Sequence, residues 1–290
     1  MPERAQHPLR GVLLFCLAVA LFACLDATAK HLSQKWPVGM LAWGRYSVHF
    51  VLMTAFLAPI WRGRLLRTKR PLMQCARGVS LVVVTVLAMA AFQRMPLAEA
   101  TALMFASPLL VAILARPILH EQIGRLRWFA ILLGFSGVLM LTRPGSGLDL
   151  LGIACALGAA VAYAAYQLMT RVMSSSEHPV TMLYYTACAG TLILSGTQPL
   201  LGTLQWPGYM DAALIAMLGL LGGTGHYLLT RAFREAPASM LSPLIYLQLV
   251  WAAMLGWLVF GDTPTTATIA GMLVIGASGL LIAWESTRRS

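Results

Sequence analysis

Long apolar runs, separated by short breaks at charged residues, proline and glycine, make up most of the chain. The runs are continuous, so they predict helices rather than the strands of a membrane barrel, in which apolar and polar residues alternate. A bilayer-spanning helix needs about 20 mostly apolar residues. Ten such helices fit 290 residues with short connections and no separate soluble domain. We expect helices near residues 10–29, 38–60, 72–92, 97–119, 124–142, 148–173, 179–201, 209–233, 237–260 and 265–284.

Composition points to the same class, an all-α polytopic membrane protein. Apolar residues make up 59% of the chain, and Asp, Glu, Lys and Arg only 11%. Soluble domains have about 25% charged residues, so this chain has too few to cover the surface of a soluble globule. Disordered chains are charge-rich and aromatic-poor, which excludes that class too. The five cysteines lack metal-ligand spacing such as C-x-x-C, so we expect no metal, cofactor or disulfide scaffold.

The net charge of +11 might suggest nucleic acid, but its distribution indicates a bilayer as the partner. With the N-terminus in the cytoplasm, 16 of the 21 Lys and Arg residues fall on the cytoplasmic side and four on the other. Positive charge is retained in the cytoplasm during membrane insertion. We therefore expect both termini to be cytoplasmic, which requires an even number of spans, and we expect no nucleic-acid partner.

The chain matches itself at an offset of about 141 residues. This divides it into halves 1–145 and 146–290 with five helices each. Because five is odd, the second half enters the membrane from the opposite side, as in the inverted repeats of secondary transporters. The matches include Gly11 with Gly152, Gly78 with Gly219, and Pro96 with Pro237.

The first helix has the outline of a secretory signal, because its apolar run ends in Ala27-Thr28-Ala29, an A-x-A cleavage pattern. The duplication argues against this interpretation. The same helix has a counterpart at 152–171 in the middle of the chain, where no signal is cleaved.

Ionisable groups within membrane spans are costly and should face a protein interior or a cavity. Asp26 either pairs with Lys30 one turn away or meets a substrate ammonium group. Arg45 either pairs with Asp26 or anchors a substrate carboxylate. Glu99 lies at a helix N-terminus, where a carboxylate complements the helix dipole. His226 has no evident structural role and is a candidate for lining a pocket.

The offset pairs several of these positions across the predicted two-fold axis: Phe22 with Tyr163, Asp26 with Gln167, Thr101 with Ser242, Phe105 with Tyr246, and Thr85 with His226. A tyrosine at mid-membrane depth needs a partner for its hydroxyl, which a hydrated cavity supplies, although bundle packing explains each residue taken alone. The predicted substrate-binding residues are Phe22, Asp26, Phe105, Tyr163, Tyr166, Gln167, His226, Tyr227, Ser242 and Tyr246.

Each half closes with an acidic residue followed by a glycine-containing last helix: Glu121 before Gly134 and Gly137, and Asp262 before Gly276 and Gly279. With the segment Asp26 to Lys30, then Pro37 and Arg45, this arrangement resembles the EamA branch of the drug/metabolite transporter superfamily, and bacterial aromatic amino-acid exporters in particular. The resemblance implies a central cavity within six helices: 10–29, 72–92, 97–119, 148–173, 209–233 and 237–260. Arg45 would then lie further out.

The resulting functional hypothesis is a monomeric secondary transporter of the bacterial inner membrane. It would export amino acids, including aromatic and other apolar ones, by alternating access. The alternative is an importer or exporter of another metabolite, such as riboflavin or S-adenosylmethionine. A membrane enzyme would need catalytic residues clustered at one face, but the six histidines are scattered. A primary pump would need a phosphate-binding loop, and a channel would need a ring of polar residues; the sequence shows neither.

Overall fold

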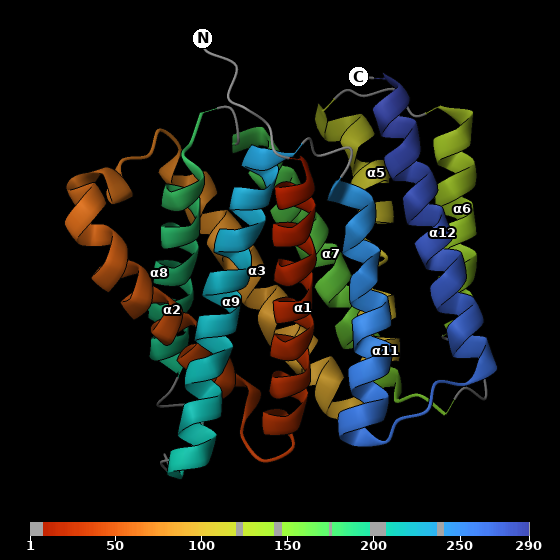
Figure 1. Cartoon of the computed structure of the whole chain (residues 1–290), viewed down its shortest axis with the longest axis horizontal. Helices are drawn as coiled ribbons and strands as arrows, with labels where there is room; N and C mark the ends of the chain where they lie inside the picture. The colour runs from red at the N-terminus through yellow and green to blue at the C-terminus, as the bar shows by residue number, and fades with distance from the viewer. Residues whose placement is uncertain are drawn as a thin grey trace. The chain divides into compact units, whose positions relative to one another are not determined.

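The computed structural model describes residues 8–119, 124–141, 147–173, 176–197, 207–236 and 241–289, and within these ranges the chain is helical without strands (Figure 1). The first half contains α1 (Pro8–Ser33), α2 (Val38–Trp61), η1 (Arg62–Leu66), α3 (Pro71–Arg94), α4 (Leu97–Met104), α5 (Ser107–Leu119) and α6 (Arg125–Leu141). The second contains α7 (Leu150–Met173), α8 (Pro179–Thr197), α9 (Tyr209–Glu235), η3 (Ser242–Tyr246), α11 (Leu247–Phe260) and α12 (Thr266–Arg289).

In the part of the chain that the structure describes, four helices are long and apolar enough to cross a membrane: Leu9–Ser33, Pro71–Arg94, Leu150–Met173 and Tyr209–Phe233. Each has at least 24 residues, above the roughly 20 that a span requires. The predicted all-α, multi-pass class is therefore confirmed.

The fourth predicted helix of each half is interrupted. The expectation of one uninterrupted helix over 97–119 was wrong, because α4 ends at Met104 and α5 begins at Ser107. Proline explains this break, since it lacks an amide hydrogen and its ring clashes with the carbonyl four residues earlier, which for Pro108 is that of Met104. In the second half, the expected helix over 237–260 is instead the 3-10 helix η3, which contains Pro243, followed by α11, and residues 237–240 lie outside the described ranges.

The chain forms two compact units, and each contains helices from both predicted halves. Unit 1 comprises Met1–Ala27, Pro96–Leu148 and Thr224–Ser290. Unit 2 comprises Thr28–Met95 and Asp149–Gly223. Helices α1 and α9 contribute residues to both. In unit 1, α6 lies beside α12 and α4 packs on α11; in unit 2, α3 packs on α7 and α2 on α8 (Figure 1).

Close packing contacts between helices recur at the same 141-residue offset as the sequence. In unit 1, a Cβ atom added to Gly11 would lie 2.5 Å from the Cβ of Ala236. In unit 2, a Cβ added to Gly152 would lie 2.6 Å from Met95 Cγ. Gly152 stands 141 positions after Gly11, and Ala236 stands 141 positions after Met95. The first helix of each half thus packs closely on the end of the third helix of the other half. The division at 145/146 stays a prediction.

Two further contacts, both in unit 2, are related to each other by the same 141-residue offset. A Cβ on Gly78 would lie 2.7 Å from the Cβ of Ala189, and a Cβ on Gly219 would lie 2.6 Å from the Cβ of Val48. Small residues at such positions allow helix backbones to approach closely, as membrane helices prefer.

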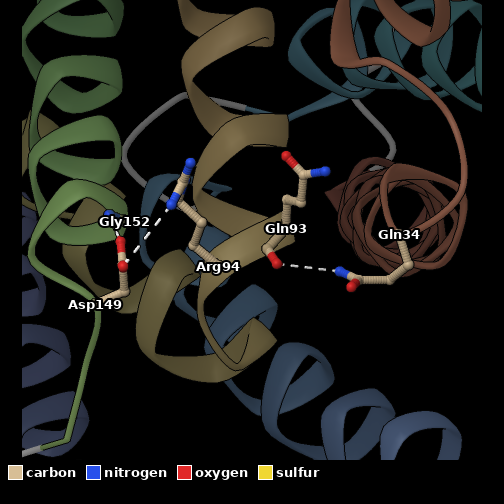
Figure 2. A network of polar contacts seen from close by, with 5 residues as sticks. All are labelled: Gln34, Gln93, Arg94, Asp149 and Gly152. Carbon is tan, nitrogen blue, oxygen red and sulfur yellow. Dashed lines mark hydrogen bonds and ion pairs between the residues drawn. The ribbon is translucent and has the colours of Figure 1, made fainter.

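Polar contacts in unit 2 join the end of α1, the end of α3 and the start of α7 (Figure 2). Asp149 caps α7, because its Oδ1 accepts a hydrogen bond of 2.6 Å from the amide of Gly152. Its Oδ2 lies 3.8 Å from Arg94 Nη1. Gln34 Nε2 donates a hydrogen bond of 3.2 Å to the carbonyl of Gln93. The start of α7 is thereby tied to the end of α3.

Unit 1 has an ion pair at the corresponding ends of α1 and α9 with the charges exchanged. Arg10 Nη1 in the first turn of α1 lies 3.9 Å from Glu235 Oε1 at the end of α9. Glu235 stands 141 positions after Arg94. The residue at the end of the third helix is therefore basic in one half and acidic in the other.

Candidate functional site

The interruptions of the fourth helices bring two predicted site residues together in unit 1. Phe105 is the C-cap residue of α4 and Tyr246 is the N-cap residue of α11. Their ring centroids lie 5.4 Å apart with planes inclined by 55°. The two residues are counterparts at the 141 offset, and such a contact is expected only near the predicted two-fold axis between the repeats. Interrupted helices at matching places in the two halves indicate the binding site in many secondary transporters.

The backbone at the first interruption remains hydrogen-bonded. The Phe105 amide donates to the carbonyl of Thr101 at 3.1 Å, and the Ala106 amide donates to that of Leu103 at 3.0 Å. Because buried backbone groups without partners are costly in a membrane, these bonds stabilise the break.

The ring of Tyr246 lies directly over the backbone of α12. A Cβ atom added to Gly279 would overlap the hydroxyl group and ring of Tyr246. The absence of a side chain at residue 279 therefore makes room for the position that Tyr246 occupies.

Phe22 and His226 form a second ring pair in unit 1. Their centroids lie 5.0 Å apart with planes inclined by 60°. A Cβ on Gly225 would lie 2.7 Å from Phe22 Cε1, so the phenyl ring packs directly on the backbone of α9. The sequence offered no structural role for His226, and this contact supplies one.

Asp26 lies one turn after Phe22 on α1, which places both residues on the same side of the helix. Gln248 Nε2, in the first turn of α11, donates a hydrogen bond of 2.9 Å to Asp26 Oδ2. Sequence reasoning missed Gln248, although an amide in the otherwise apolar helix α11 was a visible signal. Lys30, the alternative partner considered for Asp26, is buried and donates to the carbonyl of Met95 at 2.6 Å.

Two further predicted residues belong to unit 1. Tyr227 follows His226 on α9, and 55% of its surface is exposed. Ser242 begins η3, but its side chain lies outside the described ones.

The remaining predicted residues, Tyr163, Tyr166 and Gln167, lie on α7 in unit 2. The rings of Tyr163 and Tyr166 stack, with centroids 5.7 Å apart and planes inclined by 11°. Gln167 is partly buried. The structure therefore divides the predicted set between the two units.

Tyr166 belongs to a network around Arg77, a side chain that sequence reasoning counted only as a cytoplasmic charge. Arg77 is 2% exposed. Its Nη2 donates to the Tyr166 hydroxyl at 2.7 Å, and its guanidinium carbon lies 4.5 Å from the centre of that ring. Its other hydrogen bonds are to Thr170 Oγ1 at 2.7 Å, the Met182 carbonyl at 2.8 Å and Thr186 Oγ1 at 2.8 Å.

Glu99 lies in the first turn of α4, where the helix dipole favours a carboxylate. It is 6% exposed, and its Oε1 accepts a hydrogen bond of 2.9 Å from Thr268. This side chain therefore also joins α4 to α12. Among the described residues, no group of three or more His, Cys, Asp or Glu is arranged to hold a metal ion.

Comparison with known proteins identifies one family along nearly the whole chain. A model of the EamA-like transporter family matches residues 9–143 and again residues 150–284. A riboflavin transporter of Rhizobium johnstonii is 30% identical, over 96% of this chain and 92% of that protein. An S-adenosylmethionine uptake transporter of Rickettsia prowazekii is 26% identical, over 99% and 97%. A pseudopaline exporter of Pseudomonas aeruginosa is 28% identical, over 91% and 93%.

A solved crystal structure has the same fold. It superposes with a TM-score of 0.69 and covers 97% of this chain and 98% of its own, at 18% sequence identity. At that identity the likeness concerns the fold alone.

Proposed function

We propose a class of transported compound for this chain, which belongs to the EamA-like transporter family. The proposed activity is secondary transport of a metabolite that combines a ring with an amino-acid group, by alternating access. Aromatic amino acids and S-adenosylmethionine are such compounds. The relatives described above are named for riboflavin, S-adenosylmethionine and pseudopaline, so an aromatic amino-acid exporter is one member of this class rather than its definition.

The observation that carries the proposal is the grouping of rings and a carboxylate in unit 1. Asp26 is one turn from Phe22, and its hydrogen-bond partner Gln248 is two residues from Tyr246. A ring can stack on aromatic side chains, while a carboxylate with an amide neighbour suits an ammonium group. Mostly apolar surroundings with a few convergent polar groups are typical of small-molecule sites.

Riboflavin is the second candidate. The Rhizobium johnstonii relative is named a riboflavin transporter and is 30% identical along nearly its whole length. Its cargo also carries a large ring system and a polar tail, but no ammonium group. Asp26 and Gln248 would then bind hydroxyl groups.

A counterflow assay separates these candidates. Purified protein in liposomes, preloaded with one unlabelled compound, is tested for uptake of the labelled form. The panel is tryptophan, phenylalanine, S-adenosylmethionine, riboflavin and, as a control without a ring, lysine. The proposal predicts uptake of at least one ring-bearing amino-acid compound, and uptake of riboflavin alone would favour the second candidate. Export is the proposed direction in the cell, tested by efflux from preloaded cells.

Replacing His226 or Tyr246 with alanine should raise the half-saturation concentration of the transported cargo about fivefold or more. A polar contact with the cargo contributes on the order of 1 kcal/mol, and about 1.4 kcal/mol corresponds to a factor of ten in affinity. Counterflow at a series of cargo concentrations measures the change. The control is Leu273→Ala, a residue that is 68% exposed on α12. Wild-type transport by both variants would contradict the assignment of the cargo site to unit 1.

We also propose that both termini lie in the cytoplasm of a bacterial inner membrane. The 16-to-4 division of Lys and Arg residues supports this orientation. Alkaline phosphatase fused after Ser290 should be inactive in cells, because that enzyme requires the periplasm. An active fusion at this position would contradict the proposed topology.

A further inference from the structure

The connection between α2 and α3 in unit 2 is strongly basic. It directly precedes α3, one of the helices that are long and apolar enough to cross a membrane. The side chains of Arg67, Lys69 and Arg70 are exposed. Residues 62–70 contain five Lys and Arg residues and no Asp or Glu: Arg62, Arg64, Arg67, Lys69 and Arg70. Clusters of about four to eight basic residues next to a membrane-spanning helix are typical of sites for anionic lipids.

This basic segment is held in one conformation. Its first five residues form η1, and Leu65 within η1 is buried. The hydroxyl of Tyr185 on α8 donates a hydrogen bond of 3.0 Å to the carbonyl of Leu66. The amide of Lys69 donates a hydrogen bond of 2.8 Å to Glu177 Oε1. The retention of positive charge on one side of a membrane explains the presence of basic residues, but it requires no fixed conformation.

Two of the carboxylates in unit 2 are far from the basic segment. Asp149 pairs with Arg94 at the end of α3, whereas the segment precedes the start of that helix. Asp211 pairs with Lys35 before the start of α2, whereas the segment follows the end of that helix. Each helix has 24 residues, which at about 1.5 Å per residue makes it about 36 Å long. These carboxylates therefore do not neutralise the segment.

The third and last carboxylate of unit 2, Glu177, is beside the segment but faces inward. It is 7% exposed, and its second oxygen accepts a hydrogen bond of 3.5 Å from Gln74 Nε2. Among the side chains that the structure describes, those of Arg67, Lys69 and Arg70 form no ion pair. The segment therefore presents positive charge that unit 2 itself leaves uncompensated.

Apolar side chains lie next to these charges along the chain. Ile60, Leu66 and Leu72 are 61–86% exposed. Trp61 ends α2, and the centroid of its ring lies 4.5 Å from that of His178. Tryptophan is enriched where a membrane meets water. Exposed apolar groups among basic ones suit a molecule with a charged headgroup and apolar chains, whereas a soluble anion needs only the charges.

We propose that segment 62–70 binds the phosphate headgroup of an anionic phospholipid, while Ile60, Leu66 and Leu72 contact its acyl chains. Arginine and lysine are the side chains that bind phosphate groups in proteins, arginine through two parallel hydrogen bonds. The bound lipid stabilises the connection between α2 and α3 against α8. This inference concerns the surface of unit 2 alone and does not depend on which compound the protein transports.

Thermal unfolding in a neutral detergent tests the proposal without a transport step. Phosphatidylglycerol, which is anionic, or phosphatidylcholine, which has no net charge, is added in increasing amounts. A ligand that binds the folded state raises the unfolding temperature according to its concentration relative to Kd. We expect phosphatidylglycerol to raise it and phosphatidylcholine to leave it unchanged.

The decisive variant is Arg67→Gln/Lys69→Gln/Arg70→Gln, which should bind phosphatidylglycerol at least about tenfold more weakly. Each basic residue near an anionic surface contributes about a factor of five. In detergent without lipid the variant should unfold at the wild-type temperature, because these side chains are exposed. If it does not fold, Arg67→Gln/Lys69→Gln replaces it, with the same expected direction.

Two controls separate charge from other effects. Arg67→Lys/Arg70→Lys keeps every charge and should keep the response to phosphatidylglycerol. Arg125→Gln removes an exposed arginine at the start of α6 in unit 1 and should respond as the wild type does. Glycerophosphoglycerol, the headgroup of phosphatidylglycerol without its acyl chains, should have no effect at the same concentration.

The inference is overturned if the two lipids raise the unfolding temperature equally, or if the triple glutamine variant keeps the wild-type response. An equal loss in the double lysine variant would also overturn it, because the loss would not be one of charge. Stabilisation by glycerophosphoglycerol equal to that by the lipid would mean a site for a soluble anion and would likewise contradict the proposal.

Discussion

Replacing Gly279 with alanine should destabilise the protein by about 1–3 kcal/mol, the usual cost of forcing an extra group into a packed interior. The added methyl group would overlap the ring and hydroxyl of Tyr246. Tyr246 must then move away from Phe105, or α12 must move away from η3. Thermal unfolding in detergent measures the loss, and counterflow shows whether the displaced tyrosine also weakens transport.

Two companion substitutions isolate the cause. Gly276→Ala lies on the same helix, where an added Cβ has no neighbour within 4 Å. It should be neutral or stabilising by up to about 1 kcal/mol, because alanine favours helix more than glycine does. In a Tyr246→Ala background, Gly279→Ala should lose its cost, because the ring that the added methyl group would overlap is no longer there. An equal cost with and without the tyrosine would show that the Tyr246 ring does not depend on Gly279.

Replacing Arg77 with methionine should cost about 3 kcal/mol of unfolding free energy. Hydrogen bonds to charged groups contribute about 1.5–3 kcal/mol each. The net cost is smaller than their sum, because some of the groups that lose Arg77 keep other hydrogen bonds. The hydroxyls of Thr170 and Thr186 keep their own bonds to backbone carbonyls. The hydroxyl of Tyr166 loses the donor that holds it. Thermal unfolding of purified protein in detergent again provides the measurement.

The matched control is Arg70→Gln, an exposed arginine just before α3. Surface substitutions usually change stability by less than about 0.5 kcal/mol. An Arg77→Met protein that unfolds at the wild-type temperature would mean that the guanidinium is replaceable by an apolar side chain. The stacked pair of Tyr163 and Tyr166 would then be oriented by helix packing alone.

Helix positions were predictable because lipid-facing and buried positions of a membrane helix are both apolar, so each span appears as a continuous run. The interruptions of the fourth helices were harder to see. Pro96 and Pro237 stand at the boundaries of predicted helices, whereas Pro108 and Pro243 stand within them. A proline inside an apolar run is tolerated in membrane helices, so it predicts a local irregularity without specifying its extent.

Within the candidate site, only the contact between residues paired by the internal repeat could be predicted from the sequence. The offset paired Phe105 with Tyr246, and the two rings are in contact. It did not identify Gln248 as the partner of Asp26, since that contact depends on how α1 and α11 approach each other. The burial of Arg77 was equally hidden, because an arginine near a helix end looks the same in sequence whether it points to water or to Tyr166.

The exchanged ion pairs at the helix ends bear on how the two halves recognise each other. Arg94 of the first half faces Asp149 of the second, and Arg10 of the first faces Glu235 of the second. If two copies of the first half were joined instead, Arg94 would approach Arg10. Two copies of the second half would bring Glu235 near Asp149. Each exposed pair contributes only about 0.2–1 kcal/mol, but in both cases attraction would become repulsion. Two separate half-length chains carrying these charges would therefore favour pairing with the other half over pairing with a copy of themselves.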